Sequence, residues 1–262
     1  RPGRGAGRDR GDAARLVDLC ERAAVSEAFQ IIRAGPAPIL IVSDHASNHV
    51  PDDIDLGIAP ELLHQHVALD IGAAEVSELL AKRLGCTAIL GGISRLVCDL
   101  NREENAPGLI PHITDGHVIP GNEHADHAER LARFHQPYHM EVARQVAAIA
   151  RPFIVSVHSF TPCLSTHPDQ QRLWEIGVLY NEDDRAARIA IPLLAAEGLI
   201  VGDQQPYSGR LLNYTMNRHA EANGIPYLGI EMRQDISGTA EGRCRYADIV
   251  APIVEQCRAQ IG

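Results

Sequence analysis

Residues 39–51 read Ile39-Leu-Ile-Val-Ser-Asp-His-Ala-Ser-Asn-His-Val-Pro51. Four apolar residues open this stretch, three of them β-branched, and a polar cluster that contains His45 follows them. A short apolar run of this kind predicts a strand that is buried in a parallel sheet. The polar cluster then lies at the carboxyl end of the strand, which is where ligand sites form in open α/β sheets.

A second apolar run ends in the same way, in Phe153-Ile-Val-Ser-Val-His158-Ser159. Two strands that each deliver a histidine where the chain leaves the sheet indicate a metal site. Imidazole suits zinc, and a catalytic zinc ion keeps three protein ligands and one open position.

Two other strand ends carry polar groups, namely the stretch Asp99–Arg102 and the acid Glu231. Glu231 follows a strongly apolar strand, so partial burial is expected to raise its pKa towards the range that suits a general base. Arg95 and Arg102 flank a strand edge and offer planar forks for a carboxylate, although Asp99–Arg102 alone is equally compatible with an ion-paired turn. Together these groups predict a hydrolase that acts on an anionic substrate.

Bulk composition excludes several other classes of protein. The net charge of −10 over 262 residues argues against a general nucleic-acid binder, which normally presents a basic face. Apolar runs are all shorter than the roughly 20 residues that span a bilayer, so we expect no membrane partner. The six cysteines form no CxxC pair, which favours reduced thiols in a cytoplasmic protein.

Strands that alternate with helices predict one α/β domain over residues 12–262, with a mixed, mainly parallel sheet flanked by helices. The Gly- and Arg-rich segment 1–11 is expected to be disordered. Helices are predicted at 12–30, 69–84, 123–150 with an interruption near Pro137, 183–197, 211–223 and 246–260. Strands are predicted at 39–42, 86–90, 95–98, 153–158, 176–181, 199–202 and 226–232.

The predicted helix at 123–150 carries four histidines, His124, His127, His135 and His139. No carboxylate or cysteine pattern completes a ligand set with them, so solvated or hydrogen-bonded histidines are the favoured interpretation. The preceding loop, 103–122, is long for a compact domain, and loops of this length are often functional.

Seven motifs along the chain resemble, in the same order, those of the N-formylglutamate amidohydrolase family. They span residues 43–235, nearly the whole of the predicted domain, and seven ordered motifs are far more specific than one. The motifs are Ser43-Asp-His-Ala-Ser-Asn48, His66-Val-Ala-Leu-Asp70-Ile-Gly72, Ser94-Arg-Leu-Val-Cys-Asp-Leu-Asn-Arg102, Ile119-Pro-Gly-Asn122, Pro137-Tyr-His139, Val157-His-Ser-Phe160 and Ile230-Glu-Met-Arg-Gln-Asp235.

The resemblance implies a phosphorylase/hydrolase-like fold related to zinc carboxypeptidases and aspartoacylase, and a zinc cofactor. It implies that His45 and His158 are metal ligands. Those relatives have a glutamate at the second ligand position, where this chain has Asn48. Either Asn48 coordinates through its carbonyl oxygen, or Asp70 or Asp44 supplies the anionic ligand.

The resemblance also assigns the remaining roles. Asn101 and Arg102 hold a substrate carboxylate, Arg95 polarises the scissile carbonyl, and Glu231 is the base. Arg233 is a further candidate for substrate binding, because Arg95, Arg102 and Arg233 together are enough arginines to meet both carboxylates of N-formylglutamate.

The implied reaction is hydrolysis of N-formyl-L-glutamate to formate and L-glutamate, as in histidine degradation. Two alternatives stay open. One is a hydrolase of another N-acyl amino acid or a small peptide. The other is a metal-free binding protein of the same fold, in which Asn48 marks a lost metal site.

Overall fold

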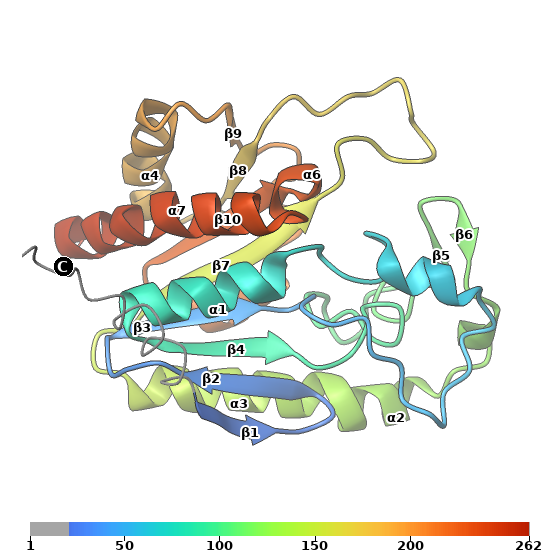
Figure 1. Ribbon diagram of the computed structural model, residues 1–262. Helices are drawn as coiled ribbons and strands as arrows, with labels where there is room; N and C mark the ends of the chain where they lie inside the picture. The colour runs from blue at the N-terminus through green and yellow to red at the C-terminus, as the bar shows by residue number, and fades with distance from the viewer. Residues whose placement is uncertain (1–20, 262) are drawn as a thin grey trace, which may run out of the picture.

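The computed structural model describes residues 21–261, and its centre is one eight-stranded sheet (Figure 1). In spatial order the strands are β1 (Glu21–Val25), β2 (Phe29–Arg33), β4 (Thr87–Gly91), β3 (Ile39–Ser43), β7 (Phe153–Phe160), β10 (Tyr227–Arg233), β8 (Ile176–Leu179) and β9 (Val201–Asp203). The four central strands, β4, β3, β7 and β10, are parallel to one another. On either side of them, β2 and β8 run antiparallel to their inner neighbours. The predicted mixed, mainly parallel sheet is therefore confirmed.

Helices cover both faces of the sheet, which explains why β3, β4 and β7 are buried along their whole length. The helices α1 (Ala73–Leu84) and α4 (Arg185–Ala196) both pack against α7 (Ala240–Ile261). The helix α3 (Gln136–Ala148) contacts β3 and α5 (Tyr214–His219). Figure 1 shows α1 and α7 in front of the sheet and α3 behind it.

The connections of β3 determine where a ligand can bind. From β3 the chain passes through α1 to β4 on one side, and β7 lies on the other side of β3. The strand order therefore reverses between β3 and β7. In open α/β sheets a crevice forms at the carboxyl ends of the two strands at such a point.

Two predicted elements are wrong. The helix predicted at 12–30 is instead the antiparallel pair β1–β2 over its described part, and pairing with β2 overrides the helical composition of Glu21–Val25. Residues 12–20, like the segment 1–11, lie outside the described residues. The strand predicted at 95–98 is a turn, because the Ser94 hydroxyl accepts the N–H of Leu96 and the Ser94 carbonyl accepts that of Val97.

The other elements were placed within a few residues. Gly85 ends α1 in the left-handed conformation, as predicted. The interruption near Pro137 is confirmed: a π-helical turn, Leu131–His135, separates α2 (His127–Arg130) from α3. The long loop 103–122 contains a small hairpin, β5 (Ile113–Thr114) and β6 (His117–Val118), which sequence analysis missed. The last helix, α7, starts earlier than predicted, at Ala240.

Across residues 21–261, no helix is both long enough and apolar enough to cross a bilayer. Within the same range the cysteines are free thiols, as expected.

Candidate metal and catalytic site

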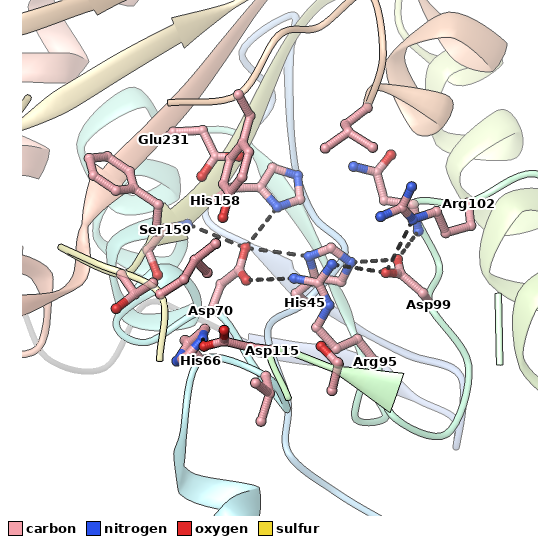
Figure 2. Close-up of a pocket in the computed structure, with 18 of the residues that line it drawn as sticks. His45, His66, Asp70, Arg95, Asp99, Arg102, Asp115, His158, Ser159 and Glu231 are labelled. Atoms are coloured by element: carbon pink, nitrogen blue, oxygen red, sulfur yellow. Dashed lines mark hydrogen bonds and ion pairs between the residues drawn. The ribbon is translucent and has the colours of Figure 1, made fainter. Parts of the chain in front are cut away.

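His45, Asp70 and His158 form a buried cluster at the crevice between β3 and β7 (Figure 2). The Nδ1 atoms of His45 and His158 lie 3.4 and 2.8 Å from the same oxygen, Asp70 Oδ2. Asp70 follows a loop and is held beside the first histidine by its own N–H, which donates to the carbonyl of His45 at 2.9 Å. One potential ligand atom from each residue lies within 4.8 Å of the others, as a bound metal ion requires.

Each histidine of the cluster meets a second carboxylate on its outer side. His45 Nε2 is hydrogen-bonded to Asp99 Oδ1 at 2.7 Å, and His158 Nε2 lies 3.2 Å from Asp44 Oδ2 in an ion-pair contact without hydrogen-bond alignment. A carboxylate behind a metal-binding histidine fixes the ring orientation and the tautomer that leaves the inner nitrogen as a ligand. The inner nitrogen of His45 is buried and lacks a hydrogen-bond partner among the described residues. These residues therefore fit a zinc ion held by two imidazoles and one carboxylate.

Of the three candidates for the third ligand, Asn48, Asp44 and Asp70, the structure brings only Asp70 to the inner side of both histidines. Asn48 does not line the cavity, and its amide nitrogen lies 3.4 Å from His64 Nδ1. Asp44 is behind His158, on the side away from Asp70. Gly72, and not Asp70, occupies the N-cap of α1.

Arg95 bridges the two carboxylates that face His45. Its guanidinium lies 3.4 Å from Asp70 Oδ1 and 2.9 Å from Asp99 Oδ2. A guanidinium has five N–H donors, so these contacts leave others free to face the cavity that Arg95 lines.

Asn101 and Arg102 lie side by side on the cavity wall. Asn101 Oδ1 accepts the N–H of Thr215 at 2.9 Å, and the side-chain NH2 of Asn101 has no protein partner within residues 21–261. Arg102 is one-third exposed, and its Nε is 3.7 Å from Asp99 Oδ2, so the contact is a loose ion pair. Both groups thus present donors to the cavity.

Glu231 lies directly across from His158 in the β7–β10 pairing. It is 7% exposed and lines the cavity, and its Oε2 has no hydrogen-bond partner among the described residues. Burial raises the pKa of Glu231 to about 7, while the nearby His158 lowers it. This is the environment that sequence analysis predicted for a general base.

Arg233, predicted to bind substrate, is not brought to the cavity. Its Nε donates to Asp235 Oδ1 at 2.8 Å, and it is not among the cavity-lining residues. Since side chains alternate along a strand, Glu231 and Arg233 would share a face, but Arg233 is the last residue of β10 and turns towards α6 (Gln234–Ser237).

The cavity has a volume of about 300 Å³, and loops form the wall opposite the strand ends. One carboxylate, Asp115 at the tip of the β5–β6 hairpin, joins these loops. It accepts the N–H groups of Ser165 and Thr166 at 2.8 and 3.0 Å, and it lies 3.0 Å from His66 Nε2. Asp115 holds a positive φ of 39°, a conformation that is strained for most residues but tolerated by aspartate.

Burial alone would raise the pKa of Asp115. The hydrogen bonds from Ser165 and Thr166 outweigh burial and hold this pKa well below its usual range. The carboxylate is therefore charged and accepting in the folded chain. We call this group of contacts the Asp115 clasp.

Behind the cavity, three buried histidines hydrogen-bond to one another or to the backbone. His139 Nδ1 lies 2.9 Å from His219 Nε2, and His139 Nε2 lies 2.9 Å from the carbonyl of Leu100. His135 Nε2 lies 2.9 Å from the carbonyl of Arg102. His135 and His139 are thus hydrogen-bonded histidines, as predicted, while His124 and His127 are exposed.

These buried histidines should make the fold acid-sensitive. Burial lowers the pKa of His139 to about 3 and that of His219 to about 4. The unfolded chain takes up protons at these groups near pH 6.5, whereas the folded chain does not, so stability falls as the pH drops from about 6.5 towards 4. Each histidine should cost about 2 kcal/mol of unfolding free energy between pH 7 and 5. Urea unfolding at both pH values, with chelator present, measures this loss.

The variant His219→Gln tests this explanation, because it keeps an N–H for His139 but does not titrate. It should lose about 2 kcal/mol less than the original chain between pH 7 and 5. Equal losses in the two proteins would assign the acid sensitivity to other groups.

Comparison with known proteins identifies the family. The family model of the N-formylglutamate amidohydrolases matches residues 37–237. Among solved structures, the chain is similar to a gene product of Agrobacterium tumefaciens, with 28% identity and a TM-score of 0.84 over 90% of this chain and 96% of the other.

The chain is also similar in fold to the N-formylglutamate amidohydrolase of Ralstonia eutropha, with 18% identity and a TM-score of 0.68 over 90% of this chain and 98% of the other. No curated protein matches the chain. The family model covers the strands that carry His45, His158 and Glu231, and by this match the chain belongs to the N-formylglutamate amidohydrolase family of amide hydrolases.

Proposed function

We propose that this chain is a zinc-dependent amidohydrolase that converts N-formyl-L-glutamate to formate and L-glutamate. The observation that carries the proposal is the arrangement of the two histidines, each with its inner nitrogen towards Asp70 and its outer nitrogen on another carboxylate. This arrangement also argues against a metal-free binding protein, because Asp70 lies where it can supply the anionic ligand that the neutral Asn48 cannot.

His45, Asp70 and His158 would hold the zinc ion. A zinc ion bound there supplies Lewis acidity and a water molecule activated for attack on the amide carbon. Zinc is preferred over magnesium or calcium because two imidazole nitrogens are poor ligands for those hard cations.

The chain's own residues supply proton transfer and charge stabilisation. Glu231, with a pKa of about 7, accepts a proton from the attacking water and returns it to the leaving amine. Arg95 faces the cavity with free donors and stabilises the negative charge that develops on the carbonyl oxygen. Water is consumed, the C–N bond breaks, and the acid and the free amine leave.

Asn101 and Arg102 bind a carboxylate of the substrate. The NH2 group of Asn101 and the guanidinium of Arg102 line the same wall and together form a set of donors that suits a planar carboxylate. N-Formyl-L-glutamate has two carboxylates; Arg102 binds one of them on this wall, whereas Arg95, which also lines the cavity, acts on the carbonyl oxygen.

A substrate panel tests the proposal. Chelator-treated protein, with and without one equivalent of zinc, is incubated with N-formyl and N-acetyl derivatives of glutamate, aspartate, glutamine and leucine. We expect metal-dependent hydrolysis, fastest with N-formyl-L-glutamate. No turnover of any compound by protein that has bound zinc, or turnover that is indifferent to chelation, would overturn it.

Arg102→Lys should weaken substrate binding. Lysine keeps the charge but loses the planar fork, so kcat/KM should fall. The fall should correspond to a loss of about 2–3 kcal/mol in transition-state stabilisation, the scale of a charge-assisted hydrogen bond. The loss should appear in KM rather than kcat. Steady-state kinetics with N-formyl-L-glutamate measure it.

Arg233→Lys is the matched control, because Arg233 pairs with Asp235 outside the cavity and its replacement should leave KM unchanged. Two analogues, each with one carboxylate amidated, complete the test. One of them should react equally with the original chain and with Arg102→Lys. If the variant penalises both analogues as strongly as the substrate, Arg102 holds the loop through Asp99 and does not bind the carboxylate.

A further inference from the structure

The motif Pro137-Tyr138-His139 has no part in the reaction as described, and it does not line the cavity. Tyr138 and His139 are fully buried on the first turn of α3, on the face of the sheet behind the site. Pro137 fits there because the N–H groups of a first helical turn have no partner within the helix.

Tyr138 contacts the carboxylate that supports one proposed metal ligand. Its hydroxyl donates to Asp44 Oδ1 at 2.7 Å, and the Thr215 hydroxyl donates to the same oxygen at 2.8 Å. These bonds orient the other oxygen, Asp44 Oδ2, towards His158 Nε2 at 3.2 Å. Asp44 is 1% exposed, so water does not replace these donors if they are lost.

His139 contacts the segment that carries the proposed carboxylate-binding residues. Its Nε2 donates to the carbonyl of Leu100, the residue before Asn101. One turn earlier, His135 Nε2 lies 2.9 Å from the carbonyl of Arg102. Two histidines thus hold the backbone of 100–102 from behind, while the side chains of Asn101 and Arg102 face the cavity.

We propose that Tyr138 and His139 are positioning residues for two separate parts of the site: Tyr138 holds Asp44 behind the ligand His158, and His139 holds the carboxylate-binding segment 100–102. The inference rests on the proposed function, since it names what these contacts position. Neighbouring residues on one helix turn thereby set the distance between the metal site and the substrate's carboxylate.

The first arm of the test is Tyr138→Phe, which removes one hydroxyl and keeps the ring. Zinc affinity, measured by competition with a chromophoric chelator, should fall about tenfold, the lower end of the effect of losing a group behind a metal ligand, because Thr215 still donates to Asp44. Thr215→Val removes the other hydroxyl that donates to Asp44, so zinc affinity should fall by a similar factor. The backbone N–H of residue 215 still donates to Asn101, so substrate binding should be preserved. KM should change less than twofold in both variants.

The second arm compares His139→Leu with His139→Gln. Leucine leaves the carbonyl of Leu100 without its donor, so KM should rise about tenfold, as expected when a binding group is slightly displaced. Glutamine carries an N–H at a similar reach and should restore most of the KM. Zinc affinity should change less than twofold in either variant.

Two measurements on metal-free protein make the result independent of activity. In His139→Leu, the amides of residues 99–102 should exchange with deuterium faster than in the original chain. In Tyr138→Phe, the ring 15N shifts of His158 should move, because its contact with Asp44 is altered. Both readouts report the contacts themselves.

Tyr180→Phe is the matched control, because Tyr180 also donates to an aspartate, Asp203, at 2.7 Å and does not line the cavity. It should leave zinc affinity, KM and both metal-free readouts unchanged.

Outcomes separate this inference from the proposed function. If the variants at 138 and 139 resemble Tyr180→Phe, or each lowers zinc affinity and raises KM together, α3 only packs against the site and the inference is wrong. If the original chain neither binds zinc nor hydrolyses the panel, the proposed function is wrong. The exchange and 15N readouts then decide whether these residues hold Asp44 and segment 100–102.

Discussion

His158→Ala should release the metal and lower kcat/KM by well over a hundredfold. Even the loss of a group behind a metal ligand costs about ten- to a hundredfold in affinity or activity, and loss of the ligand itself costs more. Replacement also leaves the buried carboxylates of Asp44 and Asp70 without the imidazole between them. Metal analysis of the purified variant and turnover of N-formyl-L-glutamate measure the two effects, and His45→Ala should behave alike.

Control variants must distinguish the loss of a metal-binding side chain from unfolding of the protein. His124 is exposed and outside the cavity, so His124→Ala should retain metal and activity. His158→Gln keeps more of the volume, and urea unfolding shows whether it folds. A folded His158 variant that keeps stoichiometric zinc and full activity would contradict the assignment of the metal site.

Glu231→Gln should lower kcat by about a hundredfold or more while zinc content stays near that of the original chain. General acid–base groups contribute about 10²–10⁴-fold, and glutamine keeps the shape of the side chain but cannot accept the proton. The loss should fall on kcat rather than KM, because proton transfer belongs to the transition state. Stopped-assay kinetics, zinc analysis and urea unfolding on one preparation give all three quantities.

Burial makes the stability measurement informative. Burial already opposes ionisation of the Glu231 carboxyl group, so a neutral amide at this position should be tolerated by the fold. Glu241→Gln, at an exposed position on α7, supplies the matched control. An unchanged kcat in a well-folded Glu231→Gln protein would mean that another group accepts the proton.

The strand ends could be predicted from sequence because their signals are local. Apolar runs such as Ile39–Val42 indicated buried strands, and parallel strands place their carboxyl ends along one edge of the sheet. The sequence therefore predicts that His45, His158 and Glu231 lie together. The β1–β2 hairpin was missed because its residues favour a helix locally and only pairing with β4 reverses that preference.

The third ligand could not be settled in the same way. Asp44 and Asn48 are in the same motif as His45, and Asp70 is in the next motif along the chain. Which of these side chains reaches the two histidines depends on how the loop after β3 folds back. That closure is made by the Asp70 N–H bond to the carbonyl of His45.

The residues that support the site from behind are even harder to predict from sequence. Tyr138 and Thr215 lie 94 and 171 residues from Asp44 in sequence, so no spacing rule connects them. The one available signal was the motif Pro137-Tyr-His139 itself, which the family resemblance singled out without a role.

The Asp115 clasp holds together one wall of the cavity, and that wall has a different structural origin from the wall at the strand ends. Of the proposed metal-binding and catalytic groups, His158 and Glu231 lie on strands of the sheet and His45 follows one closely, while the opposite wall comes from the β5–β6 hairpin and segment 161–172, joined through one carboxylate. Loops tolerate insertion and substitution far better than packed strands do. The size and shape of accepted substrates can therefore diverge among relatives, or be redesigned in a library confined to residues 112–118 and 161–172, while the reaction itself is inherited unchanged.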